Sequence, residues 1–137
     1  MARRQAGPNK KSLPGRLRIV AGNWRSRLLE IADVPGLRPT SERIRETLFN
    51  WLAPHIQGAR CLDLFAGTGA RGLEALSRGA AGSVFVETSA KALATLRHNL
   101  AALQAEGATF GGASALEYLV AGCVGNFDVV LLDPTFG

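Results

Sequence analysis

Hydrophobic runs and helix-patterned segments alternate through the second part of this chain. Apolar runs typical of strands begin at 61 and recur over 83–87, 108–112 and 127–133. Segments rich in Ala and Leu separate them and predict helices over 70–78, 89–103 and 114–122. Because strands that are apolar almost throughout alternate with helices, we expect an α/β fold with a doubly wound, mostly parallel sheet.

The first part of the chain has a different pattern. Residues 16–31 contain two short runs around a Gly-Asn pair, which predicts a β-hairpin arm. Thr40 or Ser41 can cap a following helix, which we expect to end at Pro54. Four apolar residues share one face of this helix, and we expect that face to be core: Ile44, Leu48, Trp51 and Leu52.

Charge is distributed unevenly along the 137 residues. Residues 1–45 hold 11 Lys and Arg against three acids (+8), and residues 46–137 hold five against eight (−3), which together give the net +5. Contacts between basic side chains and phosphates give nucleic-acid affinity that is independent of sequence, so the basic front indicates a polyanion partner. For the first 15 residues alone, a solubilising tail explains the charge equally well.

The composition, 47% hydrophobic and 20% charged, is that of a globular protein and excludes a disordered chain. No apolar run reaches membrane-spanning length, and no hydrophobic segment of a signal peptide follows the basic N-terminus. We therefore expect a cytoplasmic protein with no membrane partner. Cys61 and Cys123 lack the spacing of a metal site or a disulfide, so we expect reduced thiols and no metal.

The stretch CLDLFAGTGARG, over 61–72, predicts a nucleotide site. A strand that breaks at Gly67 and Gly69 lets the backbone approach a ligand, and the start of the next helix is electropositive. Glu87 follows Gly67 by 20 residues, the spacing at which an acid reaches ribose hydroxyls; its other possible role is to cap the next helix. Asp63 is expected to bind loop amides or to face a cationic cofactor. The glycine spacing fits NAD-binding proteins as well.

Arginines crowd the hairpin arm around Trp24. Guanidinium groups bind phosphates and an aromatic ring stacks on bases, so this combination of side chains suits RNA binding. The other explanation is a solvated edge whose Trp24 packs on the domain. Arg38, Arg43 and Arg45 lie at or near the start of a helix, where cations are mildly unfavourable, so RNA or an acidic ligand is their expected partner. The candidate RNA-binding residues are Arg16, Arg18, Arg25, Arg27, Arg38 and Arg43.

The tetrapeptide Asp133-Pro134-Thr135-Phe136 directly follows the last apolar run. It resembles the D-P-P-F signature of methyltransferases that use S-adenosylmethionine and act on exocyclic amino groups. The resemblance implies that the Asp133 carboxylate and the Pro134 carbonyl accept the N–H groups of the amine. It also implies that Phe136 stacks on the flipped base. Orientation of an activated donor then supplies most of the catalysis.

Longer stretches extend the resemblance over about residues 16–136. They are R-I-V-A-G-N-W-R-S-R-L-L, G-L-R-P-T-S-E-R-I-R-E-T-L-F-N-W-L and C-L-D-L-F-A-G-T-G-A-R-G-L-E-A-L-S-R-G-A. Together they resemble the bacterial 16S ribosomal RNA guanine-N2 methyltransferases of the RsmD family. The resemblance implies a Rossmann-like class I methyltransferase fold with S-adenosylmethionine as cofactor. It implies as substrate one guanine of 16S rRNA, within a partly assembled small ribosomal subunit.

The resemblance also implies roles for single residues. The cofactor-binding set is Asp63, Phe65, Gly67, Gly69, Glu87 and Ser114, and the catalytic set is Asp133, Pro134 and Phe136. Ser114 stands where an Asp or Asn is expected to read the adenine amine, and Thr135 stands where the family has a second proline. We expect both differences to weaken the enzyme, since a second proline would hold Pro134 in an extended backbone.

The apolar run 127–133 is followed by no strand that could pair with its free edge. We therefore expect a C-terminally truncated methyltransferase domain over 16–137, divided into an arm over 16–58 and a partial core over 59–137. A disordered basic tail over 1–15 precedes it, and the full-length protein is expected to be a monomer. Two alternatives stay open: a remnant that binds RNA without catalysis, and, from the glycines alone, an NAD-linked oxidoreductase.

Overall fold

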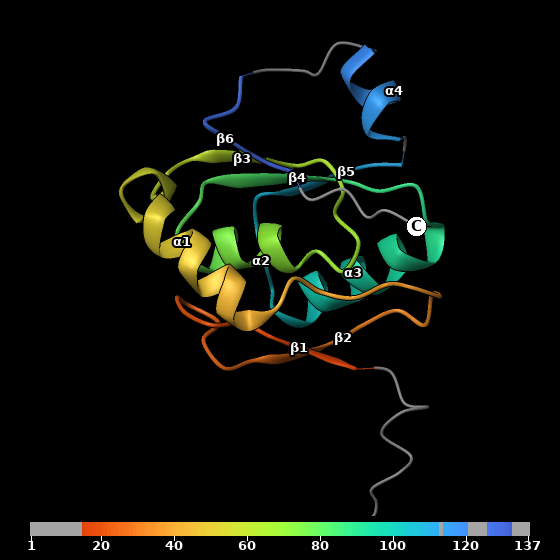
Figure 1. The fold of residues 1–137 in the computed structure, drawn as a ribbon, viewed down its shortest axis with the longest axis horizontal. Coiled ribbons are helices and arrows are strands. Elements are labelled where there is room, and N and C mark those ends of the chain that lie inside the picture. The colour runs from red at the N-terminus through yellow and green to blue at the C-terminus, as the bar shows by residue number, and fades with distance from the viewer. Residues whose placement is uncertain (1–14, 113, 121–125, 133–137) are drawn as a thin grey trace, which may run out of the picture.

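The computed structural model describes residues 15–112, 114–120 and 126–132 (Figure 1). The elements of this part of the chain are β1 (Arg16–Arg18), β2 (Leu28–Glu30), α1 (Glu42–Ile56), β3 (Arg60–Asp63), α2 (Ala70–Ser77), β4 (Gly82–Val86), α3 (Ala90–Ala102), β5 (Ala108–Gly111), α4 (Ala115–Val120) and β6 (Val129–Leu131). Every strand and helix expected from the sequence is present, with ends that differ by a few residues.

The main sheet has four parallel strands in the order β5–β4–β3–β6. The chain runs outward from β3 to β5 and then returns past β3 to β6, so the winding reverses between β3 and β6. Helices α1, α2 and α3 lie on one face of the sheet and α4 on the other (Figure 1). This confirms the doubly wound sheet. Ligands of such sheets bind beyond the carboxyl ends of the strands where the winding reverses, here beyond Asp63 and Leu131.

The hairpin arm forms a third layer beneath the helices (Figure 1). Its strands β1 and β2 pair antiparallel, with Leu17 opposite Leu29. Both side chains are buried, as are those of Ile19 and Ile31, and all four pack into one core with α2 and α3. The expected arm is therefore confirmed, and it is an integral part of the core.

Helix α2 lies between the sheet and the arm, and all of its residues are buried. A Cβ at Gly72 would lie 2.3 Å from Cε1 of Phe85 on β4, so only glycine lets the helix approach the sheet this closely. On the side that faces the arm, α2 carries polar residues. Because solvent does not reach them, these side chains need partners inside the protein.

Helix α1 buries a different face from the one expected. Ser41 caps it as expected, since its hydroxyl accepts a hydrogen bond from the Ile44 N–H at 3.2 Å. However, Ile44 is 62% and Trp51 76% exposed, so these two of the four expected core positions are wrong. Leu48 and Leu52 are partly buried and pack against the core, as expected. The buried residues are instead Arg45, Phe49 and Ile56. The buried face of α1 is centred one residue later than expected, because a buried carboxylate of α2 holds Arg45 inside the protein.

The expected end of α1 at Pro54 is also wrong. The helix continues for two residues to Ile56, which is 1% exposed. A proline in a last turn removes one N–H donor, and the burial of Ile56 offsets this loss. The helix expected over 89–103 begins as predicted, because the Ser89 hydroxyl caps α3 by accepting from the Ala92 N–H at 3.1 Å.

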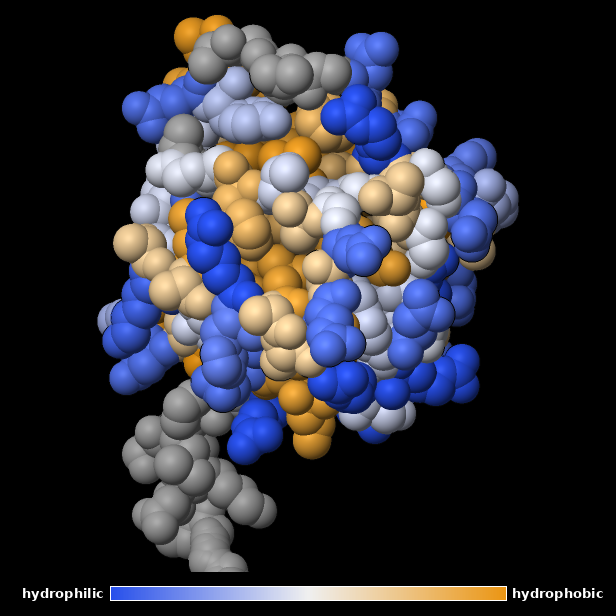
Figure 2. Space-filling model, turned by 180° about the vertical axis from the view of Figure 1, so that it is seen from behind, coloured by the Kyte–Doolittle hydropathy of each residue, from blue (hydrophilic) through white to orange (hydrophobic). Residues whose placement is uncertain are grey.

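The face of the sheet that α4 covers remains partly open. Val130 and Leu132, in and after β6, are 48% and 62% exposed, and large hydrophobic side chains on α4 are exposed as well. From behind, hydrophobic surface forms a band among hydrophilic residues (Figure 2). Among the described residues, β6 pairs with β3 alone. No helix within the described ranges combines the length and the hydropathy that crossing a bilayer requires.

Candidate functional site

A pocket of about 270 Å³ lies at the carboxyl ends of β3 and β4. It is lined by three of the expected cofactor residues, which come from three different loops. Phe65 comes from the turn after β3, Glu87 directly follows β4, and Ser114 directly precedes α4. The pocket therefore lies at the carboxyl edge of the sheet, where parallel sheets bind ligands, and beside β3, one of the two strands between which the winding reverses.

Glu87 connects the two loops that border this pocket. One carboxylate oxygen accepts from the Gly67 N–H at 2.7 Å and the other accepts from the Ser89 N–H at 2.9 Å. Glu87 thus binds the amide of Ser89, the residue that caps α3, and does not itself cap a first-turn amide as one reading of the sequence predicted. It also holds the glycine loop, because Gly67 lies in that loop. A pocket wall fixed by two charge-assisted hydrogen bonds is formed before any ligand arrives.

Asp63 is fully buried beneath the glycine loop and does not line the pocket. One of its oxygens accepts from the Gly72 N–H at 3.2 Å and the other accepts from the Arg71 guanidinium at 3.3 Å. The same guanidinium nitrogen donates to the Phe65 carbonyl at 2.8 Å. Burial raises the pKa of Asp63, and the charge of Arg71 opposes that rise. Asp63 therefore binds an amide in the first turn of α2 and the side chain of Arg71, and neither contact is to a loop amide as expected.

The glycine loop has a left-handed backbone at two positions, with φ of +54° at Gly67 and +82° at Gly69. A Cβ at Gly69 would lie 2.5 Å from Cδ1 of Leu96 on α3. The amides at the start of α2 already have acceptors within the protein. The Gly69 N–H donates to the Ala66 carbonyl and the Ala70 N–H to the Thr68 hydroxyl. The helix start is therefore less open to an anion than the sequence indicated.

Ser114 has a structural role that the sequence analysis missed. Its hydroxyl accepts from the Glu117 N–H at 3.1 Å, while the Glu117 carboxylate accepts from the Ser114 N–H at 3.0 Å. These bonds lower the pKa of Glu117. The S-x-x-E spacing of a capping box was the available signal. Ser114 lies on the pocket as expected, with its hydroxyl oriented by the first turn of α4.

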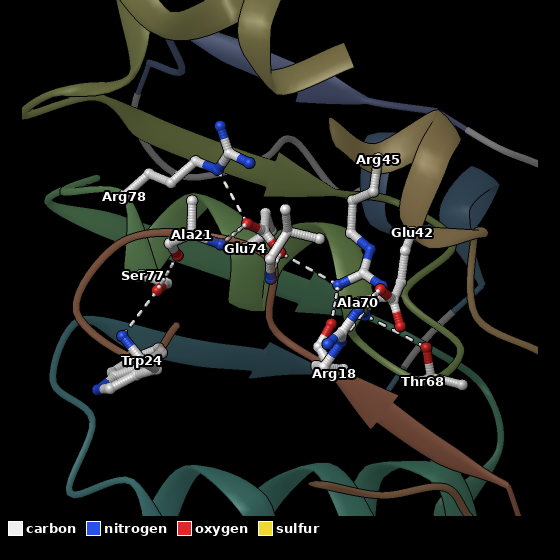
Figure 3. Close-up of polar contacts among 12 residues, drawn as sticks. Arg18, Ala21, Trp24, Glu42, Arg45, Thr68, Ala70, Glu74, Ser77 and Arg78 are labelled. Atoms are coloured by element: carbon white, nitrogen blue, oxygen red, sulfur yellow. Dashed lines mark hydrogen bonds and ion pairs between the residues drawn. The ribbon is translucent and has the colours of Figure 1, made fainter. Parts of the chain in front are cut away.

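A buried ionic network joins the arm to the helices (Figure 3). The Glu74 carboxylate, which is not exposed at all, accepts from the guanidinium groups of Arg45 at 3.1 Å and Arg78 at 2.8 Å. It also accepts from the backbone amides of Val20 and Ala21 in the arm, both at 3.0 Å. Arg45, for which RNA or an acidic ligand was expected, therefore has an internal partner.

Further side chains bind the backbone of the arm. The Ser77 hydroxyl accepts from the Trp24 N–H at 3.0 Å and donates to the Ala21 carbonyl at 2.6 Å. The Asn99 side chain on α3 pairs with both the N–H and the carbonyl of Glu30. Trp24 packs against the core, which agrees with the alternative to base stacking given for this residue in the sequence analysis. The arm is thus fixed in position by polar contacts to α1, α2 and α3.

All six candidate RNA-binding arginines have exposed side chains. Arg18 forms an ion pair with Glu42 at the start of α1, with 2.6 Å between guanidinium nitrogen and carboxylate oxygen. Hydrogen bonding to Arg18 lowers the pKa of Glu42. The arm therefore presents a positively charged outer surface, whereas its inner surface belongs to the core.

The expected catalytic residues Asp133, Pro134 and Phe136 lie outside the described residues, as does Cys123. The strand that leads to them is described: Leu131 of β6 lies opposite Asp63 of β3, and the Leu64 N–H donates to the Leu131 carbonyl. Cys61 is buried and forms no disulfide. Within the described ranges, no three His, Cys, Asp or Glu side chains gather as a metal site would require.

A family model described as Conserved hypothetical protein 95 matches residues 17–137. The chain belongs to this family. Ribosomal RNA small subunit methyltransferase D of Escherichia coli K12 is 49% identical over 122 residues, which are 89% of this chain and 61% of that protein. The Haemophilus influenzae protein of the same name is 46% identical over 94% of this chain and 67% of its own length. The family resemblance is thereby confirmed, and the chain is shorter than these relatives.

Solved structures of the family and beyond share the fold. The Escherichia coli protein yhhF superposes with a TM-score of 0.71 at 48% identity, over 77% of this chain and 56% of that chain. A Thermus thermophilus 16S rRNA N2 methyltransferase, RsmC, in complex with AdoMet and guanosine, has a TM-score of 0.70 at 22% identity, over 91% of this chain and 33% of its own. The second likeness shows the fold alone. The expected Rossmann-like class I methyltransferase fold is confirmed.

Proposed function

We propose that this chain provides the cofactor site and the RNA-binding arm of an S-adenosylmethionine-dependent methyltransferase. Its substrate is the exocyclic N2 of a guanine in 16S rRNA. The observation that carries the proposal is the Glu87 carboxylate, which lines the pocket while its oxygens hold the amides of Gly67 and Ser89. The names of the relatives from Escherichia coli and Haemophilus influenzae support methyl transfer to small-subunit rRNA.

The residues of the pocket fit S-adenosylmethionine. A carboxylate has about four lone-pair sites, so Glu87 keeps acceptors for two ribose hydroxyls while it holds both amides. Phe65 offers a partly exposed ring and Ser114 a hydroxyl on other walls of the same pocket. The adenosine part of the cofactor would therefore meet an acid for its ribose and both an apolar and a polar group for its base.

A dinucleotide fits the same site less well. Its pyrophosphate would need amides at the start of α2. The amides of Gly69, Ala70 and Gly72 already donate to protein acceptors, and the acceptor of the third is the Asp63 carboxylate. This arrangement favours a cofactor without phosphates over NAD.

The bound cofactor supplies a methyl group on a sulfonium, an activated donor. The chain's own contribution is to position the amine. From the family resemblance, the Asp133 carboxylate and the Pro134 carbonyl accept its two N–H groups and orient the nitrogen lone pair, and Phe136 stacks on the base. The topology supports these roles, because β6 leads to these residues beside the end of β3.

Calorimetry of cofactor binding tests the site. Glu87→Gln should bind S-adenosylmethionine about 10- to 100-fold more weakly, since charge-assisted hydrogen bonds to the ribose are lost. Asp128→Asn is the matched control, because Asp128 also accepts from a backbone amide, that of Arg60 at 2.9 Å, but at the amino ends of the strands. The site assignment fails if both variants bind like the wild-type chain, or if the wild-type chain binds NAD in preference.

Transfer of labelled methyl groups to small ribosomal subunits that lack the modification tests the reaction. We expect incorporation at guanine N2 that Asp133→Ala abolishes. A chain that binds RNA and transfers no methyl group would instead support the second candidate, an RNA-binding remnant. That candidate stays relevant because the chain spans 61% of the Escherichia coli relative.

A further inference from the structure

The arginines of the arm separate into two grooves on different sides of the hairpin. Arg18 and Arg25 meet Arg43 of α1 in a groove of about 470 Å³, which we name the arm–α1 groove. Arg16 and Arg27 border a second groove of about 600 Å³ between β2 and α3, which we name the arm–α3 groove. The sequence gives no reason to treat these two groups of arginines differently.

Net charge does not distinguish the two grooves. The arm–α1 groove also contains Glu42 and Glu46, so its three arginines and two acids leave one positive charge. The arm–α3 groove contains two arginines and Glu30, which again leave one positive charge when histidine is not counted. Any difference in RNA binding between them must therefore come from their positions.

The arm–α1 groove is linked to α2 by hydrogen bonds. The Arg18 carbonyl, at its edge, accepts from the Arg45 guanidinium at 2.7 Å, and Arg45 is bonded to Glu74, one turn after the glycine loop. The connection from the arm to α1 passes over that loop, since a Cβ at Gly67 would lie 3.2 Å from Cδ1 of Leu37. The close-up shows Arg45 bonded both to the Arg18 carbonyl and to Glu74 (Figure 3).

The arm–α3 groove borders the second half of α3. Its α3 residues include His98 and Ala102, whereas α3 begins beside Glu87. Nine residues of helix separate Ser89 from His98, a distance of about 13 Å at 1.5 Å per residue. RNA held there would lie along the far end of α3, away from the candidate site.

In the arm–α1 groove, one arginine already forms an ion pair with a carboxylate of the protein itself. The carboxylate of Glu42 lies 2.6 Å from Arg18, and both side chains are about half exposed. Exposed ion pairs are weak, so an RNA phosphate that also contacts Arg25 and Arg43 can displace this carboxylate. Because the arm backbone is held by Glu74 and Ser77, the part of the chain that carries Arg18 and Arg25 is positioned before RNA arrives.

We propose that the arm–α1 groove binds the phosphodiester backbone of the RNA strand that carries the target base, and that Glu42 is the internal counter-ion which a phosphate replaces at Arg18. The inference rests on the proposed function, since it names the part of the surface that the RNA substrate contacts. It assigns the arm–α3 groove no part in holding that strand.

Two charge-matched double variants test the proposal in the full chain. Fluorescence anisotropy with a short labelled single-stranded RNA gives the affinity as a function of salt. Arg25→Gln with Arg43→Gln should weaken binding about 25-fold at about 0.1 M salt and lower the salt slope by about 1.4, the values for two lost phosphate contacts. Arg16→Gln with Arg27→Gln removes the same charge and should weaken binding and lower the slope by less than half as much, because only the general attraction of positive charge for RNA is reduced.

A third variant tests the counter-ion. Glu42→Gln should bind the RNA about two- to fivefold more tightly, because it removes a competing carboxylate. Weaker binding by this variant would overturn the role of Glu42, and equal losses in the two double variants would overturn the groove assignment. Either result leaves cofactor binding untouched, so it is distinguishable from failure of the proposed function. That failure would be seen as a wild-type chain that binds neither S-adenosylmethionine nor RNA.

Discussion

The buried carboxylate of Glu74 gives the sharpest prediction for stability. Substitution by glutamine keeps the size of the side chain and removes its charge. Four donors surround this carboxylate: the guanidinium groups of Arg45 and Arg78 and the amides of Val20 and Ala21. A glutamine offers one acceptor oxygen and turns its NH2 group toward two of these donors. Arg45, which is 1% exposed, then loses its counter-charge.

The magnitude follows from the loss of one partner of a buried ion pair. Such a loss costs about 3–5 kcal/mol, because the remaining charge stays buried and uncompensated. Burial already lowers the pKa of Arg45, and the charge of Glu74 opposes this. Arg45→Met should cost less than Glu74→Gln, since Glu74 keeps Arg78 and both amides. The double variant should cost less than the sum of the singles, with a coupling of about 1–3 kcal/mol.

Urea unfolding followed by tryptophan fluorescence measures these differences. Trp24 packs against the core beside the arm, whereas Trp51 is exposed, so a Trp51→Phe background leaves one reporter of arm docking. The reasoning is refuted if Glu74→Gln lies within about 0.5 kcal/mol of this parent, the range of ordinary surface substitutions. Additive costs in the double variant would show that the two side chains do not act as a pair.

Two further predictions concern the packing of single residues. Gly22→Ala should lower the free energy of unfolding by about 1–3 kcal/mol more than Gly36→Ala, as measured by urea midpoints. Both glycines have left-handed φ, but only at Gly22 would a Cβ meet a neighbour, the Ser77 carbonyl oxygen at 2.0 Å. Burial raises the pKa of Cys61 from 9.0 to about 11. In a Cys123→Ser background the Cys61 thiol should resist alkylation until the chain unfolds. The free energy of unfolding relative to Cys61→Ala should fall as pH rises from 9 toward 11, because the thiol of the unfolded chain ionises before the buried one.

Features encoded by local spacing could be predicted from the sequence. The alternation of apolar runs with helical segments set the order of the elements. The glycines at 67 and 69 marked the turn, because their backbone conformations exclude most other residues. The separation of 20 residues between Gly67 and Glu87 predicted an acid that reaches ribose hydroxyls, and this role stays a prediction. The hydrogen bond from the Gly67 amide to Glu87 was not anticipated.

Features that depend on distant partners could not be predicted. Arg45 belongs to the buried face of α1 only because Glu74, 29 residues later, lies opposite it. Asn99 is buried because it pairs with the backbone of Glu30, 69 residues earlier. No periodicity marks such positions, since a polar residue on a helix ordinarily indicates the solvent-facing side. The error in the core face of α1 has this origin.

Helix α2 explains why the arm and the glycine loop belong to one rigid unit. Near its start, Arg71 holds the Phe65 carbonyl in the loop, and one turn later Glu74 holds the arm. Ser77, near its end, binds the arm again at Ala21 and Trp24. These side chains are buried on a helix that is covered on both sides, so none can change partner without exposing a charge or a dipole to an apolar interior. The arm–α1 groove is therefore held in fixed register with the pocket, and RNA bound by the arm would meet a cofactor site whose position is already set.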